Sequence, residues 1–79
     1  MAERLELRYD READILYISR RQPYPEQETE DLGDEVVARL NPTTHEIENL
    51  EVLFFTKRLL AGGRFELPVR ADIRRASQN

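Results

Sequence analysis

The stretch Tyr9-Asp10-Arg11-Glu12-Ala13-Asp14-Ile15-Leu16-Tyr17-Ile18 places a polar corner between two short apolar runs. Just before it, Leu5 and Leu7 alternate with charged residues, which is typical of a strand with one buried face. After the corner, residues 15–18 are apolar on both faces, as in a strand that is covered on both sides. Asp10 can accept hydrogen bonds from the next backbone amides and so hold a tight turn. The stretch therefore predicts a β-hairpin.

Residues 19–33 interrupt the apolar pattern that the hairpin begins. Pro23 and Pro25 remove two backbone donors, and the like-charged run that follows has no apolar period. This composition predicts a long surface loop.

Two further strands and a helix are predicted after the loop. Residues 35–40 are rich in β-branched side chains, and residues 46–53 form the next apolar run. The alternation in that second run slips once, which predicts a β-bulge near Glu48 and Asn49. Residues 54–61 then indicate about two helical turns, which Gly62 and Gly63 end.

Together these elements predict an α+β fold, namely a four-stranded antiparallel β-meander with one short C-terminal helix packed on it. Residues 1–61 form the single domain in this interpretation, and residues 62–79 form an extended C-terminal arm. Phe65, Leu67 and Val69 alternate with other residues in the arm, so one alternative is an edge strand with a frayed end. That strand would pair within its own subunit or across a dimer.

The length of 79 residues and the absence of cysteine limit what the protein can be. A single domain of this size buries only about 60% of its unfolded surface, which favours a homo-oligomer, and a dimer first. Without cysteine there is neither a disulfide nor thiolate chemistry. The chain has no apolar run of roughly 18 residues and no apolar leader, so we expect a cytoplasmic protein without a membrane segment.

Charge is distributed unevenly along the chain. The net charge is -4, but residues 1–56 carry six basic and fourteen acidic side chains, whereas residues 57–79 carry six basic and two acidic ones. An overall acidic surface disfavours nucleic acid, because phosphate affinity needs an unopposed basic surface. We expect the basic tail to dock onto acidic groups of its own or a second copy instead.

The acidic run between Gln22 and Ala38 suggests a binding function. Six carboxylates occur between Gln22 and Ala38 without a single Lys or Arg. Such a run is usually a solvated loop, but it can also steer a basic partner protein. The predicted acidic partner patch consists of Glu26, Glu28, Glu30, Asp31, Asp34 and Glu35.

Two groups of residues could carry chemistry, and neither has a complete motif. Asp10, Glu12 and Asp14 have the spacing of the first half of a calcium loop, but the later Gly and Glu of such a loop are missing. His45 is the single imidazole, and its only neighbour with acid or base character is Glu46. We therefore expect no catalytic residues, no metal and no cofactor, with turn capping and solvated charge as the roles of these side chains.

Apolar side chains near the C-terminus suggest an interface. A short helix turns only one face inward, so one of Phe54 and Phe55 should lie on an exposed apolar patch. The alternative is that Phe54, Phe55 and Leu60 are each buried in the core. The predicted interface residues are Phe54, Phe55, Leu60, Phe65 and Leu67.

Four pieces of the chain carry a resemblance to a known family. They are Tyr9-Asp10-x-Glu12-Ala13-Asp14-x-Leu16-Tyr17-Ile18, Gly33-Asp34-x-Val36-Val37, Ile47-x-x-Leu50-x-Val52-Leu53 and Lys57-Arg58-Leu59. In this order and spacing the chain, over residues 5–60, resembles the small bacterial domain-of-unknown-function family 2283. The resemblance implies a four-stranded meander with a helix, and an antitoxin-like protein encoded beside a basic nuclease toxin. It carries over no catalytic residue.

This chain departs from the family pattern at two places. Phe54 stands where members usually have a polar helix-capping residue, and the turn at residues 41–46 is about one residue longer than the usual hairpin.

The functional expectation is a non-enzymatic protein-interaction module, antitoxin-like, that masks a basic partner protein. The alternative is a homo-oligomeric structural or scaffold protein. An enzyme that depends on the carboxylates or on His45 has the least support.

Overall fold

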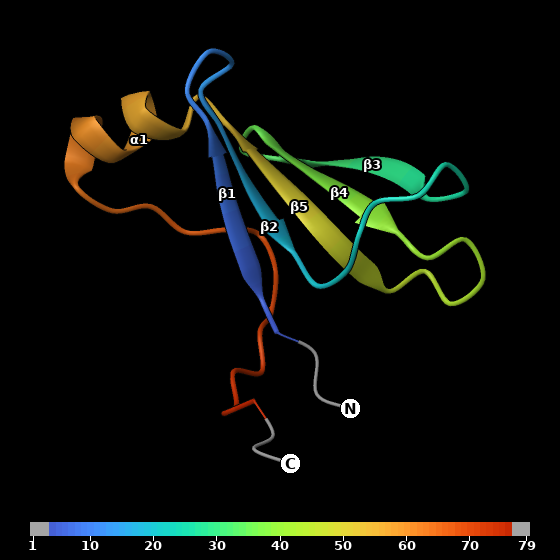
Figure 1. The fold of residues 1–79 in the computed structure, drawn as a ribbon. Helices are drawn as coiled ribbons and strands as arrows, with labels where there is room; N and C mark the ends of the chain where they lie inside the picture. The colour runs from blue at the N-terminus through green and yellow to red at the C-terminus, as the bar shows by residue number, and fades with distance from the viewer. Residues whose placement is uncertain (1–3, 77–79) are drawn as a thin grey trace.

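The computed structural model describes residues 4–76, in which one antiparallel sheet is accompanied by a single short helix (Figure 1). The strands are β1 (Glu6–Asp10), β2 (Ile15–Ser19), β3 (Glu28–Gly33), β4 (Val36–Leu40) and β5 (Ile47–Leu53), and the helix is α1 (Phe55–Gly62). The chain is thus an α+β protein whose helix follows the last strand, as the sequence predicts.

The order of the strands across the sheet is β1-β2-β5-β4-β3. The prediction of a four-stranded meander is therefore wrong in two respects. Residues 4–76 contain five strands, and the β1–β2 hairpin pairs with β5 and not with the strand that follows it in sequence. Leu16 lies opposite Val52 and Ile18 opposite Leu50, so apolar pairs join the hairpin to the β3–β4–β5 meander.

Strand β3 corrects the prediction of a loop over residues 19–33. Only residues 20–27 form a loop, and Glu28–Gly33 pairs with β4 at the edge of the sheet. Most side chains of β3 are exposed on both faces, so this strand needs no apolar alternation. The charges that indicated a loop are compatible with an edge strand, which backbone hydrogen bonds hold in place.

The predicted β-bulge in β5 is confirmed. Arg39 lies opposite Asn49, whereas the next residue, Leu40, lies opposite Ile47. Glu48 is therefore the extra residue of the bulge. As a result of the register shift, the side chains of both Glu48 and Asn49 are buried.

One face of the sheet carries the core, and the C-terminal arm covers it. The buried apolar side chains are Val36, Ala38, Leu40, Leu50 and Val52. Leu67 and Val69 of the arm pack against this cluster, whereas no residue of α1 is buried. The prediction that the helix closes the core is wrong, because the backbone bends into a left-handed conformation at Phe54 (φ 53°) and α1 projects beyond β1 (Figure 1).

The helix ends where the sequence predicts. Gly63 adopts φ 76°, and its N–H donates a hydrogen bond to the carbonyl of Leu59 at 2.6 Å, which is a left-handed helix cap. Residues 63–76 then form neither a helix nor a strand, so within this chain the arm is not an edge strand. The predicted frayed end at residues 77–79 lies outside the described residues.

Candidate functional site

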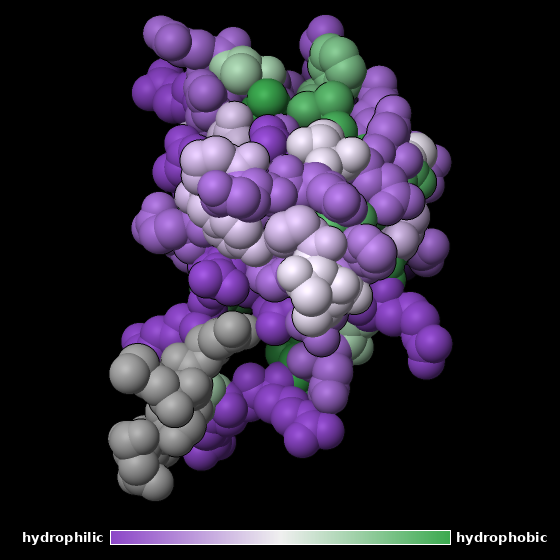
Figure 2. Space-filling model, turned by 90° about the vertical axis from the view of Figure 1, so that its right-hand side faces the viewer, coloured by the Kyte–Doolittle hydropathy of each residue, from purple (hydrophilic) through white to green (hydrophobic). Residues whose placement is uncertain are grey.

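The predicted acidic partner patch forms one edge of the molecule. Three of its side chains are on β3, one precedes the strand and two form the turn into β4, and all six residues are exposed. Seen from the side of β3, the surface is largely hydrophilic, with apolar atoms only in smaller areas (Figure 2). In chain order the patch consists of Glu26, Glu28, Glu30, Asp31, Asp34 and Glu35.

A tight turn holds the end of this edge. Asp34 and Glu35 both have positive φ values, of 54° and 59°, which is the backbone of a type I′ hairpin turn. Gly33 precedes them with φ 86°, and its N–H donates to the Asp31 carboxylate at 2.9 Å. The N–H of Leu53 donates to the carbonyl of Glu35 at 2.9 Å, which ties the turn to β5. Two carboxylates are thereby fixed at the tip of the β3–β4 hairpin.

The patch has little cationic compensation among residues 4–76. Glu28 Oε1 lies 3.7 Å from His45 Nε2, and this contact is an ion pair only when the imidazole is protonated. Arg58 donates a hydrogen bond to the backbone carbonyl of Asp34 and not to its carboxylate. Within the described residues, the other five carboxylates of the patch have no ion pair.

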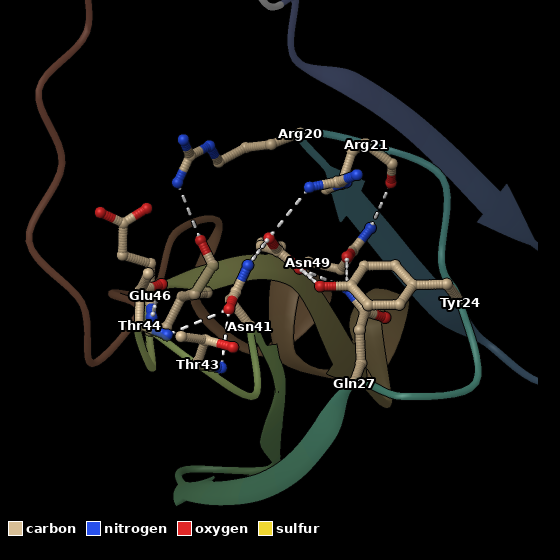
Figure 3. Close-up of polar contacts among 11 residues, drawn as sticks. Arg20, Arg21, Tyr24, Gln27, Asn41, Thr43, Thr44, Glu46 and Asn49 are labelled. Atoms are coloured by element: carbon tan, nitrogen blue, oxygen red, sulfur yellow. Dashed lines mark hydrogen bonds and ion pairs between the residues drawn. The ribbon is translucent and has the colours of Figure 1, made fainter.

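The sequence prediction missed a buried polar network around Glu48, which Figure 3 shows in part. Four side chains donate hydrogen bonds to its carboxylate. The donors are Tyr24 Oη at 2.7 Å, Gln27 Nε2 at 2.9 Å, Asn41 Nδ2 at 3.1 Å and Arg21 at 3.3 Å. Glu48 is only 6% exposed, so these donors replace the water that the carboxylate lost on folding.

Asn49 extends the same network into the loop before β3. Its Oδ1 accepts a hydrogen bond from Gln27 Nε2 at 2.8 Å, and its Nδ2 donates to the carbonyl of Arg21 at 2.8 Å. Gln27 Nε2 thus bridges the two bulge residues, while Gln27 Oε1 is buried and accepts no hydrogen bond from residues 4–76. The bulge in β5 therefore anchors residues 21–27.

These hydrogen bonds keep Glu48 ionised. The bond from Tyr24, followed by the bond from Gln27, lowers the pKa of Glu48 to about 2, although burial acts in the opposite direction. The same contact raises the pKa of Tyr24. The only signal of this network in the sequence was the slip in alternation at residues 48 and 49. That slip indicated where the network lies but not which residues donate hydrogen bonds to Glu48.

A second polar cluster lies where α1 begins. Asp14 Oδ1 accepts hydrogen bonds from the Tyr9 hydroxyl at 2.6 Å, from the Thr56 N–H at 3.0 Å and from Thr56 Oγ1 at 2.9 Å. The carbonyl of Asp14 accepts the N–H of Phe55 at 3.0 Å. Asp14 thus satisfies two of the backbone donors that an α-helix leaves free in its first turn.

This arrangement explains how Phe54 can occupy the capping position. Phe54 makes no side-chain capping bond, and the carboxylate from the β1–β2 turn supplies the cap from a distance in sequence. The bond from Tyr9, with help from Thr56, lowers the pKa of Asp14, and the same bond raises the pKa of Tyr9.

The residues considered for metal binding or catalysis are not brought together. Asp10 Oδ1 accepts the N–H groups of Glu12 and Ala13 at 3.0 and 3.2 Å, as predicted for a turn cap. His45 lies in the turn before β5, at the opposite end of that strand from Asp10 and Asp14. Among residues 4–76, no group of three or more acidic, His or Cys side chains has the arrangement of a metal site.

The five predicted interface residues separate into two sets. Phe55 is in contact with the Tyr9 ring (centroids 5.8 Å apart) and with the Phe65 ring (6.0 Å), and Leu67 packs on the core. Phe54 and Leu60 are exposed, Leu60 by 84%. The expectation of one exposed and one packed Phe at the start of the helix agrees with this placement.

Within residues 4–76, the arm docks on the sheet through apolar side chains, and none of its arginines forms an ion pair with the sheet. Leu67 and Val69 contact the core, and a hollow of about 770 Å³ lies between the arm and Ile18, Ile47 and Leu50. The ion pair that Arg74 makes is local, with Asp72 at 3.1 Å.

The sheet, the single helix and the returning arm define a small α+β domain with two different sheet edges. The family model described as "Protein of unknown function (DUF2283)" matches residues 6–53, which is more than half of the chain. The chain belongs to this family. Neither a curated protein nor a solved structure matches it. The one helix in residues 4–76 is much too short to span a bilayer.

Proposed function

We propose that this protein is a non-enzymatic interaction module of the cytoplasm that masks a basic partner protein. The acidic β3 edge is the observation that supports this proposal best. It presents six exposed carboxylates, and within residues 4–76 only that of Glu28 has a possible ion-pair partner, His45. An edge strand also has one row of unpaired N–H and C=O groups, to which a strand of the partner can add.

The chemistry of the partner follows from this edge. Lys and Arg side chains on the partner would face the carboxylates, so complementary charge would accelerate association and give specificity. A basic nuclease of the kind that the family resemblance implies has this chemistry, which makes the role antitoxin-like. Glu48 and Asn49 support the proposal indirectly, because their network holds residues 21–27 and so fixes where β3 begins.

The test asks whether a neighbouring gene encodes a small basic protein and, where it does, measures binding between the two proteins. Isothermal titration should give a dissociation constant that rises steeply with salt, because screening weakens interactions between exposed charges. The double variant Glu28→Gln/Glu30→Gln should bind about tenfold more weakly at low salt, since each lost surface charge contributes a fraction of a kcal/mol to about 1 kcal/mol.

A matched control removes two carboxylates elsewhere. Glu12→Gln/Glu66→Gln changes the net charge equally, and both residues are exposed and outside the patch. Equal loss of binding in both double variants would mean that net charge alone matters and would overturn the assignment of the β3 edge. The scaffold alternative predicts no binding to the neighbouring protein at any salt concentration.

A further inference from the structure

Exposed apolar side chains gather beside the other edge of the sheet. Residues 4–76 include seven large apolar side chains that are exposed, and six of them belong to β1, to α1 or to the residues adjoining them. Leu5 and Leu7 are each 60% exposed, which is unusual for side chains on the core face of a sheet. The six are Leu5, Leu7, Tyr9, Phe54, Leu59 and Leu60.

The backbone of β1 is also free on its outer side. The N–H of Arg20 donates to the carbonyl of Glu48, so the backbone groups of Arg20 face β5. Backbone N–H and C=O groups alternate in direction from one residue to the next along a strand, so those of Tyr17 and Ser19 face β1. The backbone groups of their partners, Arg8 and Glu6, therefore face β2. The N–H and C=O groups of Leu5, Leu7 and Tyr9 face outward, and within residues 4–76 the only strand that pairs with β1 is β2.

We propose that a second copy of this chain pairs with β1, antiparallel, about a two-fold axis that passes beside Leu7. Leu7 then faces Leu7 of the other copy, and Leu5 faces Tyr9, so the outward peptide groups of both strands meet. On the opposite face, Glu6 of each copy lies opposite Arg8 of the other, and Arg4 lies opposite Asp10. Every charged residue from Arg4 to Asp10 gains an oppositely charged partner.

Neighbouring registers lack this complementarity. A shift of the axis to Arg8 places Arg8 opposite itself and Glu6 opposite Asp10. A shift to Glu6 places Glu6 opposite itself and Arg4 opposite Arg8. Like charges that face each other directly across strands are destabilising. Registers centred on Leu5 or Tyr9 leave fewer residues of β1 facing one another.

The assembly closes at two copies because the second edge repels itself. Strand β3 carries Glu28, Thr29, Glu30 and Asp31 in succession, and every central antiparallel register of two such strands sets one carboxylate opposite another. Strand β1 contains no proline and has a regular register with β2, so neither a proline nor a bulge blocks this edge. The pairing uses the β1 edge and not the β3 edge, so it does not depend on the function proposed for β3.

Helix α1 belongs to the same surface. It projects past β1 at the end of the strand near Asp10 (Figure 1). A second copy that pairs with β1 therefore also meets the helix, whose exposed apolar residues include Leu59 and Leu60. One second copy would therefore cover the exposed apolar side chains of both β1 and α1.

Single-cysteine crosslinking of the full chain tests the register, because the parent contains no cysteine. In the proposed pair, the two copies of residue 7 are directly opposite, with Cα atoms about 5.5 Å apart, within the range that a disulfide bridges. Leu7→Cys should therefore form a covalent dimer under mild oxidation. Monomeric behaviour of this variant at all concentrations would overturn the proposal.

Leu5→Cys is the matched control, since Leu5 is exposed to the same extent as Leu7. The two copies of residue 5 would be about 13 Å apart along the strands, too far for a disulfide. Crosslinking of Leu5→Cys as readily as of Leu7→Cys would indicate a different register or random collision, and either result contradicts the proposed axis.

Charge reversal gives an independent readout by sedimentation. Glu6→Arg and Arg8→Glu each set like charges opposite each other and should raise the dimer dissociation constant at least about tenfold. The double variant Glu6→Arg/Arg8→Glu restores opposite charges and should recover most of the affinity. Single variants that sediment like the parent, or a double variant as weak as the singles, would refute the pairing of these two residues.

Discussion

A single carboxylate connects the β1–β2 turn to the helix. Asp14 accepts hydrogen bonds from the Tyr9 hydroxyl and from the first turn of α1, at distances of 2.6 to 3.0 Å. Helix capping thus comes from a residue far away in sequence, which frees position 54 to carry an aromatic side chain. The exposed Phe54 ring is thereby compatible with a stable start of the helix.

Glu48 should give the fold a distinctive pH dependence. Its pKa is about 2 in the folded chain and 4.5 ordinarily, so its carboxylate stabilises the fold above the ordinary value. That contribution disappears as the pH falls from about 4.5 through about 2, because the unfolded chain then binds the proton first. Glu48→Gln should lower the melting temperature at neutral pH and flatten its decline in acid. Circular dichroism melts over this pH range measure both effects.

The neighbouring Glu46→Gln serves as the control, since the Glu46 side chain is exposed. Its contact with the network is through the backbone carbonyl, which accepts the N–H of Asn41 and is kept in the variant. Its melting temperature should fall in acid as steeply as that of the parent. An unchanged acid limb in Glu48→Gln would contradict the role of the buried carboxylate.

The left-handed backbone at Phe54 should cost stability. Non-glycine residues in this conformation are strained by roughly 1 to 2 kcal/mol, whereas glycine is not. Phe54→Gly should therefore be more stable than Phe54→Ala by about 1 kcal/mol in urea unfolding, since both variants lose the ring. Equal stability of the two variants would show that the bend carries no such strain.

At the scale of the elements, the sequence predicted those features of the strands and the helix that depend on residues close to one another in the chain. The Asp10 turn, the bulge at Glu48 and the glycine end of α1 each depend on residues within a few positions of one another. Strand β3 was missed because an edge strand with two exposed faces has the composition of a loop. The pairing of β2 with β5 was missed because it joins residues that are 30 to 38 positions apart, from Ser19↔Asn49 to Ile15↔Leu53.

The polar network around Glu48 was missed for the same reason. Tyr24 and Gln27 reach Glu48 only because the β2–β5 pairing brings residues 20–27 alongside the bulge. A pattern along the sequence reveals that a polar residue occupies an unusual position in a strand. It does not reveal which distant donors compensate the burial.

The arm should contribute to stability more than its lack of regular structure indicates. Leu67 and Val69 cover the core, so the double variant Leu67→Ala/Val69→Ala should lower the free energy of unfolding by about 1 to 3 kcal/mol. Ile73→Ala is the control, because that side chain is 90% exposed and its loss should change little. Chemical denaturation compares the three proteins. A double variant as stable as the parent would mean that the arm is not docked in solution.

At the scale of the whole molecule, the two edges of the sheet are chemically opposite. The β3 edge is acidic and repels a copy of itself, whereas the β1 edge has alternating charges that complement a copy of itself. If self-pairing uses β1, both acidic edges remain free at the outer ends of the joined sheet. A basic partner and a second copy would then bind without competing.

Hydrogen exchange can detect this division of the edges residue by residue. The amides of Leu7 and Tyr9 face away from β2, so they should exchange fast in dilute solution and become protected as the protein concentration rises. The amide of Arg8 faces β2 and should be protected at every concentration. Thr29 on β3 faces away from β4 by the same alternation, and its amide should stay unprotected throughout. Slow exchange at Thr29 in concentrated samples would assign self-association to the acidic edge and so reverse the roles of the two edges.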